Sequence, residues 1–535
     1  MSTIREESYD LLRTLGLTTV FGNPGSTEET FLQNFPSDFT YVLGLQEASV
    51  VAMADGYAQG IGGPALVSLH TEAGVGNAMC MIMTAWYNKT PLLITAGQQV
   101  REMILYEPLL TNIAPRELPA PFVKWSYQPV RPEDIPAAFM RAYVTALQPP
   151  AGPVFLSLPL DDMNKPASGK AAIRHTSRRV EPDADALYEF ADILSNSSNP
   201  VLILGAALDR SPGGWNAGVK LAEKVRAPVW SPPNSERSGF PENHPLYQGT
   251  LPAALGPLSE KLQGHDVALV IGAPAFRYYA YVPGDYLPAG TRLLLVSDDP
   301  REVEITLAGD GILGDVAHAC TVLTQALREP STRRVPPPAQ SASTPPEPTT
   351  PITPDFLFYT LAQVKREDAI IVAETESNAS ILKRYVKATR PGSFFTGLAA
   401  GGLGFDLPAA AGLALAQRRT GQNRQVIAVI GDGAFQYSIQ ALYTMAQHQL
   451  PLTVIVPRNE EYAVLKAFAE LEHAPGVPGL DLPGLDIVSQ AKGFGVDARS
   501  VANPNRLRQM LQEALAADGP MVVEVPITKA VPPLL

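Results

Sequence analysis

Asp432 and Asn459 have the types and the spacing needed to hold a divalent cation next to a phosphate group. Gly431 and Gly433 flank Asp432 directly after one apolar run, and Asn459 follows the next apolar run along the chain. Glycines let backbone N–H groups approach an anion, and the helix expected after them adds its positive end. If the two runs are neighbouring parallel strands, the carboxylate, the amide oxygen and the Glu461 carbonyl would meet at one sheet edge and suit octahedral magnesium. Without that strand context, Gly-Asp-Gly is more often an ordinary turn.

Glu47 and His70 are the candidates for proton transfer. Glu47 stands between an apolar run and an Ala-rich helical stretch, and His70 stands between another apolar run and a Gly-rich loop. Histidine ordinarily titrates near neutrality, so His70 could donate and accept a proton within one cycle. Glu72, two residues later, adds a carboxylate that is expected to act on His70. Taken alone, Glu47 is better explained as a helix-start glutamate favoured by the helix dipole, so its meaning depends on the distant Asp432 loop.

Short apolar runs followed by helical patterns recur along the whole chain, and these are the elements that must position the candidate residues. This alternation predicts parallel sheets covered by helices on both faces. The predicted fold class is therefore α/β, with three doubly wound parallel-sheet domains. The boundaries expected from composition are a first domain over 1–165, a middle domain over 182–328, a Pro-rich linker over 329–354 and a last domain over 355–535.

Composition excludes several classes of protein. The chain has 535 residues, too many for one hydrophobic core, and its 45% hydrophobic and 18% charged residues describe a globular enzyme. The net charge of -12 comes without a lysine or arginine run, so nucleic acid is not expected as a partner. No stretch is long and apolar enough to span a membrane, and the acidic N-terminus lacks a signal core, so we expect a cytoplasmic protein. Cys80 and Cys320 are expected to be buried and reduced.

The motifs resemble those of thiamine diphosphate-dependent 2-oxo acid decarboxylases, and most of all those of the benzoylformate decarboxylases. In that family Gly-Asp-Gly is followed by a spacer and an Asn-Asn pair; here 24 residues lead to Arg458-Asn459. Other segments that carry the resemblance are Gly22-Asn23-Pro24-Gly25-Ser26, Leu45-Gln46-Glu47-Ala48, Ala400-Gly401-Gly402-Leu403-Gly404-Phe405 and Val477-Pro478-Gly479-Leu480-Asp481. The resemblance implies thiamine diphosphate with Mg²⁺ (or Ca²⁺), and pyrimidine-binding, middle and diphosphate-binding domains. It leaves Arg458 as a departure that adds positive charge near the phosphates.

The resemblance also assigns catalytic roles residue by residue. Glu47 would hydrogen-bond the pyrimidine ring of the cofactor, Ser26 would bind the substrate carboxylate and His70 would be the acid-base catalyst. Benzoylformate decarboxylases carry a second catalytic histidine, and Tyr279 stands in that position here. A phenol, with a pKa of about 10, donates a hydrogen bond but is a poorer proton shuttle at neutral pH.

The remaining implied residues surround the cofactor and the substrate. The Gly401 carbonyl would hold the pyrimidine amino group, and Leu403 would be the wedge that bends the cofactor. The diphosphate and the metal would lie against Ser377, Asn378, Asp432, Gly433, Ala434, Asn459 and Glu461. An aromatic pocket would be lined by Leu109, Leu110, Val464, Leu465 and Phe468.

The activity implied by the resemblance is non-oxidative decarboxylation of an aromatic 2-oxo acid to an aldehyde and CO₂ through a thiamine diphosphate enamine, with a place in mandelate catabolism. A carboligase or aldehyde lyase on the same scaffold is the main alternative, because the second histidine is missing. A catalytically silent cofactor-binding paralogue is another, and a nicotinamide dehydrogenase is disfavoured because no Gly-x-Gly-x-x-Gly follows a first strand. In the family Glu47 and the metal site would come from different subunits, which implies a homodimer or homotetramer.

Overall fold

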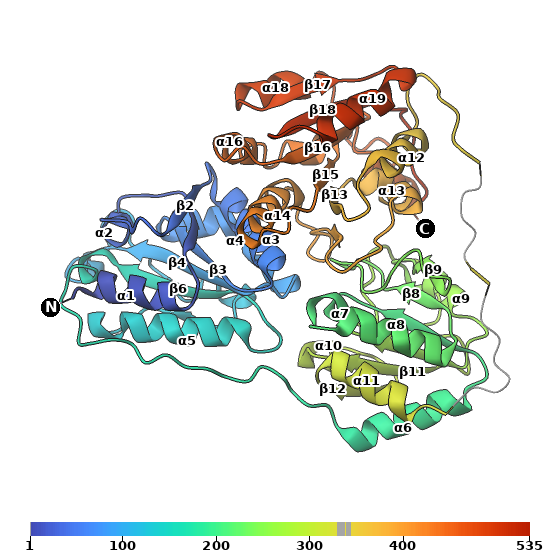
Figure 1. Ribbon diagram of the computed structural model, residues 1–535, viewed down its shortest axis with the longest axis horizontal. Helices are drawn as coiled ribbons and strands as arrows, with labels where there is room; N and C mark the ends of the chain where they lie inside the picture. Colours follow the sequence, from blue (N-terminus) through green and yellow to red (C-terminus); the bar gives the residue numbers. More distant parts are fainter. Residues whose placement is uncertain (1, 329–336, 339–343, 535) are drawn as a thin grey trace.

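Three parallel six-stranded sheets, each packed between helices, make up the computed structural model of the chain (Figure 1). The structure describes residues 2–328, 337–338 and 344–534. The α/β class with three doubly wound sheets, predicted from the sequence, is confirmed. Two parts of the predicted linker, 329–336 and 339–343, lie outside the described residues.

The first sheet has the strand order β2-β1-β3-β4-β6-β5. Its strands are β1 (Thr19–Gly22), β2 (Thr40–Leu43), β3 (Ala65–Leu69), β4 (Leu92–Gln98), β5 (Ser126–Tyr127) and β6 (Val154–Pro159). Its helices are α1 (Ile4–Thr14), α2 (Glu29–Leu32), α3 (Glu47–Ile61), α4 (Thr71–Tyr87) and α5 (Ile135–Leu147). Apolar residues of α1 and α5 share one core with the sheet, and those of α3 and α4 share another, so both faces are covered. Both faces of the inner strands are buried, as their continuous apolar runs require.

The middle sheet has the order β12-β11-β10-β7-β8-β9. Its strands are β7 (Pro200–Leu204), β8 (Val229–Ser231), β9 (Tyr247–Thr250), β10 (Val267–Ile271), β11 (Arg292–Ser297) and β12 (Asp310–Leu313). Its helices are α6 (Ala184–Asn196), α7 (Ala207–Arg210), α8 (Gly214–Val225), α9 (Leu255–Lys261), α10 (Pro300–Glu304) and α11 (Val316–Ala326). Lys89, just after α4, joins this domain to the first one, because its Nζ lies 2.7 Å from Glu302 Oε1 and 3.1 Å from Asp299 Oδ2.

The third sheet has the order β14-β13-β15-β16-β18-β17. Its strands are β13 (Ile370–Glu374), β14 (Phe394–Phe395), β15 (Val426–Ile430), β16 (Leu452–Arg458), β17 (Asp497–Ser500) and β18 (Met521–Pro526). Its helices are α12 (Pro354–Val364), α13 (Ala379–Tyr385), α14 (Asp406–Thr420), α15 (Asp432–Phe435), α16 (Ala441–Gln447), α17 (Ala463–Leu471), α18 (Ile487–Gly493) and α19 (Pro504–Leu515). β15 and β16 pair directly, with Val429 opposite Ile455, so their carboxyl ends meet at one edge.

Helices α3 and α14 pack against each other and join the first domain to the third (Figure 1). Two glycines make this approach possible. A Cβ atom on Gly56 would overlap the Ala409 carbonyl oxygen, and one on Gly412 would overlap the Met53 carbonyl oxygen. The backbones are therefore in direct contact, and the buried residues of both helices belong to a single core.

Cys320 is buried as predicted, whereas the prediction for Cys80 is wrong because its side chain is exposed. Ala73, Gly76, Asn77 and Cys80 recur at intervals of three or four residues and form an exposed face of α4. No helix among the described residues has the length and apolar character needed to cross a membrane. The cytoplasmic location stays a prediction.

Candidate active site

Glu47 is held at the start of α3 by two amide groups. Asn23 Nδ2 donates to Oε1 and Asn77 Nδ2 donates to Oε2, each at 3.0 Å, and the glutamate side chain is buried. Asn23 follows β1 and Asn77 lies in α4, so donors from two different elements orient both carboxylate oxygens. Neither asparagine is predicted from the sequence to have this role.

His70 lies between β3 and α4, and the carboxylate beside it comes from Glu28. His70 Nδ1 lies 2.9 Å from Glu28 Oε2 and 3.2 Å from Thr27 Oγ1. Glu72 points elsewhere, because its Oε1 accepts a hydrogen bond of 2.5 Å from the Ala114 N–H. Glu28, not Glu72, is therefore the carboxylate that contacts the imidazole. Its closeness in sequence to Ser26 is the only signal that could have found it.

Ser26, Leu109 and Leu110 lie on loops that follow β1 and β4. Ser26 is exposed between β1 and α2. Leu109 is 85% exposed, and Gln99 Nε2 donates a 2.6 Å hydrogen bond to its carbonyl oxygen. Because the carboxyl ends of parallel strands share one edge of the sheet, these loops open on the same side as Glu47 and His70. Because Leu109 is this exposed, its side chain does not line a pocket within the first domain.

Asp432 and Asn459 come together at the carboxyl ends of β15 and β16. Asp432 Oδ1 accepts from the Gly433 N–H at 2.9 Å, and Oδ2 accepts from the Glu460 N–H at 2.7 Å. Asn459 Oδ1 lies 3.3 Å from the Glu461 nitrogen. Burial raises the pKa of Asp432, and the two backbone N–H groups oppose that shift. A carboxylate, an amide oxygen and main-chain carbonyls thus lie within one small loop pair, as the sequence predicts.

The residues around this loop fit a diphosphate group. A Cβ atom on Gly433 would lie 2.5 Å from the Tyr462 ring, so only glycine leaves the backbone uncovered there; Ala434 is the next residue of α15. The hydroxyl oxygens of Thr375 and Ser438 are buried without a hydrogen-bond partner in the described part of the chain. Unpaired buried hydroxyls are costly and call for an absent partner.

Ser377 and Asn378 occupy a short 3₁₀ turn, η5 (Glu376–Asn378), after β13. Ser377 Oγ accepts a 3.1 Å hydrogen bond from the Val464 N–H, which ties this turn to α17. Burial raises the pKa of Glu376 to about 7. Part of its negative charge is therefore lost at neutral pH, which reduces the conflict between this acid and a neighbouring phosphate.

Gly401 and Leu403 lie on the loop before α14, and Glu374 fixes that loop. Gly401 has a φ of +70°, which a residue with a side chain rarely adopts. Glu374 accepts from the Gly404 N–H at 2.5 Å and from the Asp406 N–H at 3.0 Å. The sequence does not predict this role for Glu374.

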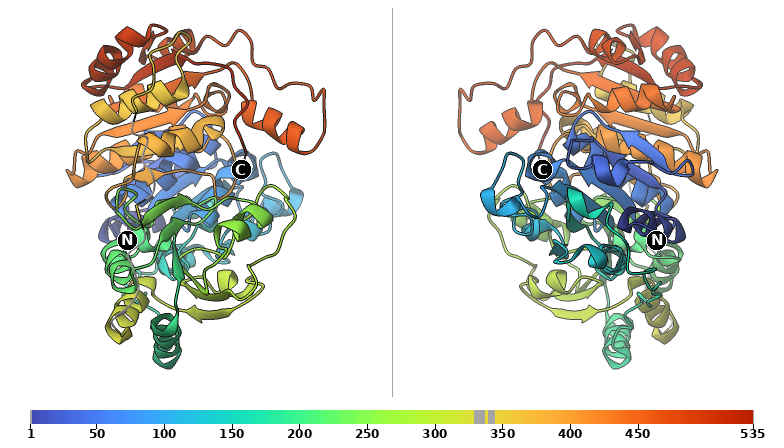
Figure 2. Two further views of the ribbon diagram at one scale, coloured as in Figure 1. Left: turned by 90° about the vertical axis from the view of Figure 1, so that its right-hand side faces the viewer. Right: turned by 90° about the vertical axis from the view of Figure 1, so that its left-hand side faces the viewer.

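Tyr279 and Phe468 form the aromatic part of the site. Their ring centroids are 4.7 Å apart in an edge-to-face arrangement, and Tyr279 is 70% exposed. Leu465, also on α17, is 42% exposed, and Val464 is partly buried. Helix α17 and the chain after it extend from the body of the third domain (orange to red in Figure 2), which lets α17 meet a residue of the middle domain.

The predicted residues therefore form two groups. Glu47, His70, Ser26, Leu109 and Leu110 belong to the first domain. The others belong to the third domain, except Tyr279, which belongs to the middle domain and contacts Phe468 of the third. Among the described residues, no hydrogen bond, ion pair or ring contact joins the two groups within one chain.

No set of three or more His, Cys, Asp or Glu in the described residues could hold a metal; the predicted ligand set needs only one such residue.

Comparisons with known proteins cover the whole chain. The N-terminal TPP binding, central and C-terminal TPP binding domains of thiamine pyrophosphate enzymes match residues 3–113, 187–324 and 377–525. The chain is 46% identical to a benzoylformate decarboxylase of Pseudomonas aeruginosa, covering 98% of this chain and 99% of that one. The crystal structure of benzoylformate decarboxylase from Polynucleobacter necessarius superimposes with a TM-score of 0.97 at 48% identity, covering 100% of both chains. A thiamine diphosphate-dependent 4-hydroxybenzoylformate decarboxylase of Rhodococcus jostii gives 0.94 at 40% identity, covering 99% and 100%.

Proposed function

Because the chain belongs to the thiamine pyrophosphate enzymes, in the family that includes the benzoylformate decarboxylases, we propose that it decarboxylates benzoylformate or a similar aromatic 2-oxo acid. The products are the aromatic aldehyde and CO₂. The observation that carries this proposal is the likeness of the entire chain, with all three domains, to proteins of that name. A place in mandelate catabolism stays a prediction.

Asp432, Asn459 and the Glu461 carbonyl would hold Mg²⁺ (or Ca²⁺), and the unpaired hydroxyl of Thr375 would meet the diphosphate. Oxygen ligands of this kind suit a hard divalent cation. Bound thiamine diphosphate supplies a nucleophilic carbon and an electron sink for cleavage of the carbon–carbon bond. Leu403 and the Gly401 carbonyl, on the loop that Glu374 fixes, would set the orientation of its rings.

The first domain and Tyr279 would handle the substrate and the protons. Glu47, oriented by its two amide donors, would hold a proton at the pyrimidine nitrogen. Ser26, exposed on its loop, would bind the substrate carboxylate, and His70 would carry a proton to or from the reacting carbon or oxygen. The Tyr279 hydroxyl would donate a hydrogen bond to the substrate, and the Phe468 ring against it favours an aromatic side chain.

We further propose that a second copy of the chain completes the site, in a homodimer or a homotetramer built from two such dimers. No hydrogen bond, ion pair or ring contact joins the two groups of site residues within the described residues of one chain. The loop after β4 exposes Leu105 at 86%, Leu109 at 85% and Ile113 at 71%. Clustered exposed apolar side chains mark interaction surfaces, and the exposed face of α4 carries small residues that permit close approach of another helix.

The test is CO₂ release from a panel of aromatic and aliphatic 2-oxo acids, with added thiamine diphosphate and Mg²⁺. We expect the highest kcat/KM for benzoylformate or a ring-substituted benzoylformate, and loss of activity when EDTA removes the metal. Glu47→Gln should lower kcat by at least about 100-fold, the size expected when a proton-transfer group is lost.

Three results would count against the proposal. Turnover of aliphatic acids with indifference to benzoylformate would refute the aromatic substrate. Condensation of benzaldehyde or formaldehyde without any decarboxylation would identify a carboligase instead. Full activity of Glu47→Gln would remove the catalytic role of the site.

A further inference from the structure

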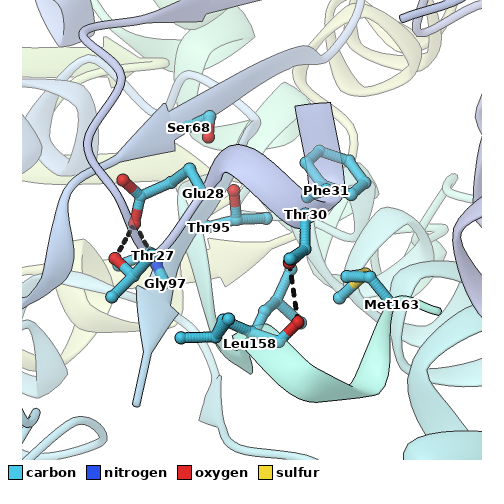
Figure 3. Close-up of a pocket in the computed structure, with 11 residues that line it drawn as sticks. Thr27, Glu28, Thr30, Phe31, Ser68, Thr95, Gly97, Leu158 and Met163 are labelled. Atoms are coloured by element: carbon cyan, nitrogen blue, oxygen red, sulfur yellow. Dashed lines mark hydrogen bonds between the residues drawn. The ribbon is translucent and has the colours of Figure 1, made fainter. Parts of the chain in front are cut away.

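Glu28 is buried beneath His70 and collects four hydrogen-bond donors on its carboxylate. Oε2 accepts from the Gly25 N–H at 2.9 Å and lies 2.9 Å from His70 Nδ1. Oε1 accepts from the Thr27 hydroxyl at 2.6 Å and from the Gly97 N–H at 2.9 Å, the two contacts drawn in Figure 3. The side chain is 3% exposed. This carboxylate is thus fixed by three separate segments of the first domain.

Two glycines leave room for the pair. A Cβ atom on Gly25 would overlap Nδ1 of the His70 ring, and one on Gly97 would overlap Oε1 of Glu28. Neither overlap can be relieved by a flexible side-chain end, because the ring and the carboxylate are themselves held by hydrogen bonds. Gly25 therefore leaves space for the His70 ring, and Gly97 leaves space for the Glu28 carboxylate. A larger residue at either position would displace the pair.

The donors determine which nitrogen of His70 carries a proton. The Thr27 hydroxyl gives its hydrogen to Glu28, so Thr27 Oγ1 can only accept from Nδ1, 3.2 Å away. Glu28 is likewise surrounded by donors and acts as an acceptor. Nδ1 is therefore the protonated nitrogen, and Nε2 has no hydrogen-bond partner among the described residues. The imidazole, 22% exposed, keeps Nε2 free for a reacting group.

We propose that Glu28 is a positioning residue that fixes the Nδ1–H form of His70 and stabilises the imidazolium each time Nε2 takes up a proton. The proton moves only at Nε2, while Nδ1 keeps its own proton throughout. Phe31, Leu158 and Met163 line the cavity on which Glu28 borders (Figure 3), and such apolar surroundings strengthen the interaction between the two charges. The catalytic part of this inference rests on the proposed function of His70.

The competing explanation is that Glu28 only ties loops together through Gly25 and Gly97. Disturbing that tie would move Ser26 and Asn23, which stand on the same loop, and would raise KM or weaken cofactor binding. If Glu28 instead positions His70, its loss would lower kcat and leave KM and cofactor affinity nearly unchanged. The KM-against-kcat split therefore separates the two explanations.

The experiment compares the holoenzyme with Glu28→Gln, Gly25→Ala and Glu29→Gln. Glu29 is the exposed carboxylate next in sequence and serves as the matched control. Glu28→Gln should lower kcat by about 100-fold, within the range of one acid-base contribution, with KM and thiamine diphosphate affinity changed less than about threefold. Gly25→Ala, which displaces the ring but leaves Glu28 in place, should also lower kcat by at least about tenfold. Glu29→Gln should match the parent protein.

A second readout needs no turnover. Diethyl pyrocarbonate modifies a neutral imidazole, and peptide mass spectrometry reports its rate at His70. Glu28→Gln should make this modification at least about threefold faster, because the charge-assisted hydrogen bond that holds the ring at Nδ1 is weakened, and Glu29→Gln should match the parent rate. Equal modification rates in Glu28→Gln and the parent protein, or a raised KM with full kcat, would overturn the role of Glu28. A parent protein without activity on any 2-oxo acid would instead overturn the proposed function, and the modification rates would still decide the inference.

Discussion

Replacing Glu374 by glutamine should remove much of the pH dependence of the protein's stability between pH 5 and pH 8. Glu374 is buried at the end of β13 and holds the Gly404 and Asp406 N–H groups of the loop that carries Leu403. Burial raises its pKa from 4.5 to about 8, and these two backbone N–H groups oppose the shift only in part. Burial also raises the pKa of Asp406, whose carboxyl group faces Glu374.

The sign follows from proton binding. A carboxyl group with a raised pKa in the folded state holds its proton there after the unfolded chain has released it, so its contribution to stability is complete below pH 4.5 and falls as the pH rises. Between pH 4.5 and about pH 8 the free energy of unfolding falls by about 1.4 kcal/mol per pH unit, so the total loss is at most about 5 kcal/mol. For unfolding of the third domain, at about 2–4 °C per kcal/mol, the midpoint should fall by at most roughly 10–20 °C over this interval.

The assay is the thermal midpoint of the holoenzyme from pH 5.5 to pH 8.5 at constant ionic strength. Glutamine keeps one acceptor for the loop but cannot ionise, so Glu374→Gln should give a flatter curve that approaches or crosses that of the parent protein near pH 8. Glu367→Gln, at an exposed surface carboxylate, should leave the slope unchanged. Parallel curves for Glu374→Gln and the parent protein would refute the reasoning, because they would show that Glu374 does not titrate in this window.

Two further predictions concern the assembly and the helix contact. If each site is shared by two copies, mixing inactive Glu47→Gln and Asp432→Ala proteins under conditions of subunit exchange should restore about one quarter of the parent activity. Half of the dimers are then mixed, and each mixed dimer has one intact site out of two. No recovery despite exchange would favour sites within single chains. Gly412→Ala should destabilise the protein by about 1–3 kcal/mol, because its Cβ overlaps the Met53 carbonyl oxygen, and an unchanged thermal midpoint would contradict the backbone contact of α3 and α14.

The sequence predicts the inner strands well and the edge strands poorly. β15 is an unbroken apolar run because both of its faces are buried, and this pattern is visible in the sequence. β14 has two residues, and β17 has one buried residue among exposed ones, so neither produces an apolar run. Such strands exist because a neighbouring strand pairs with their backbones, and backbone pairing leaves little trace in residue type.

The same limit explains why Glu28 is missed and Glu72 is favoured. Glu72 is near His70 in sequence, but residues two apart at a helix start point to different sides, and its carboxylate reaches the Ala114 N–H instead. Glu28 meets the imidazole across 42 residues, and Gly97 across 69, because three loops leave one sheet edge together. The order of strands and helices along the chain locates that edge, but it does not show which side chain turns inward there.

Arg458 shows how a departure from the family motif is compensated locally. The arginine ends β16, and its guanidinium forms ion pairs with Glu524 on the neighbouring strand β18 and with Glu460 in the following turn. Two carboxylates therefore offset the added positive charge before it reaches the phosphate loop. Consistently, burial and backbone N–H groups affect the pKa of Asp432 more than Arg458 does. The protonation of Asp432 thus depends mainly on its burial and on nearby backbone N–H groups, and less on Arg458, the substitution that looks most disruptive in the sequence.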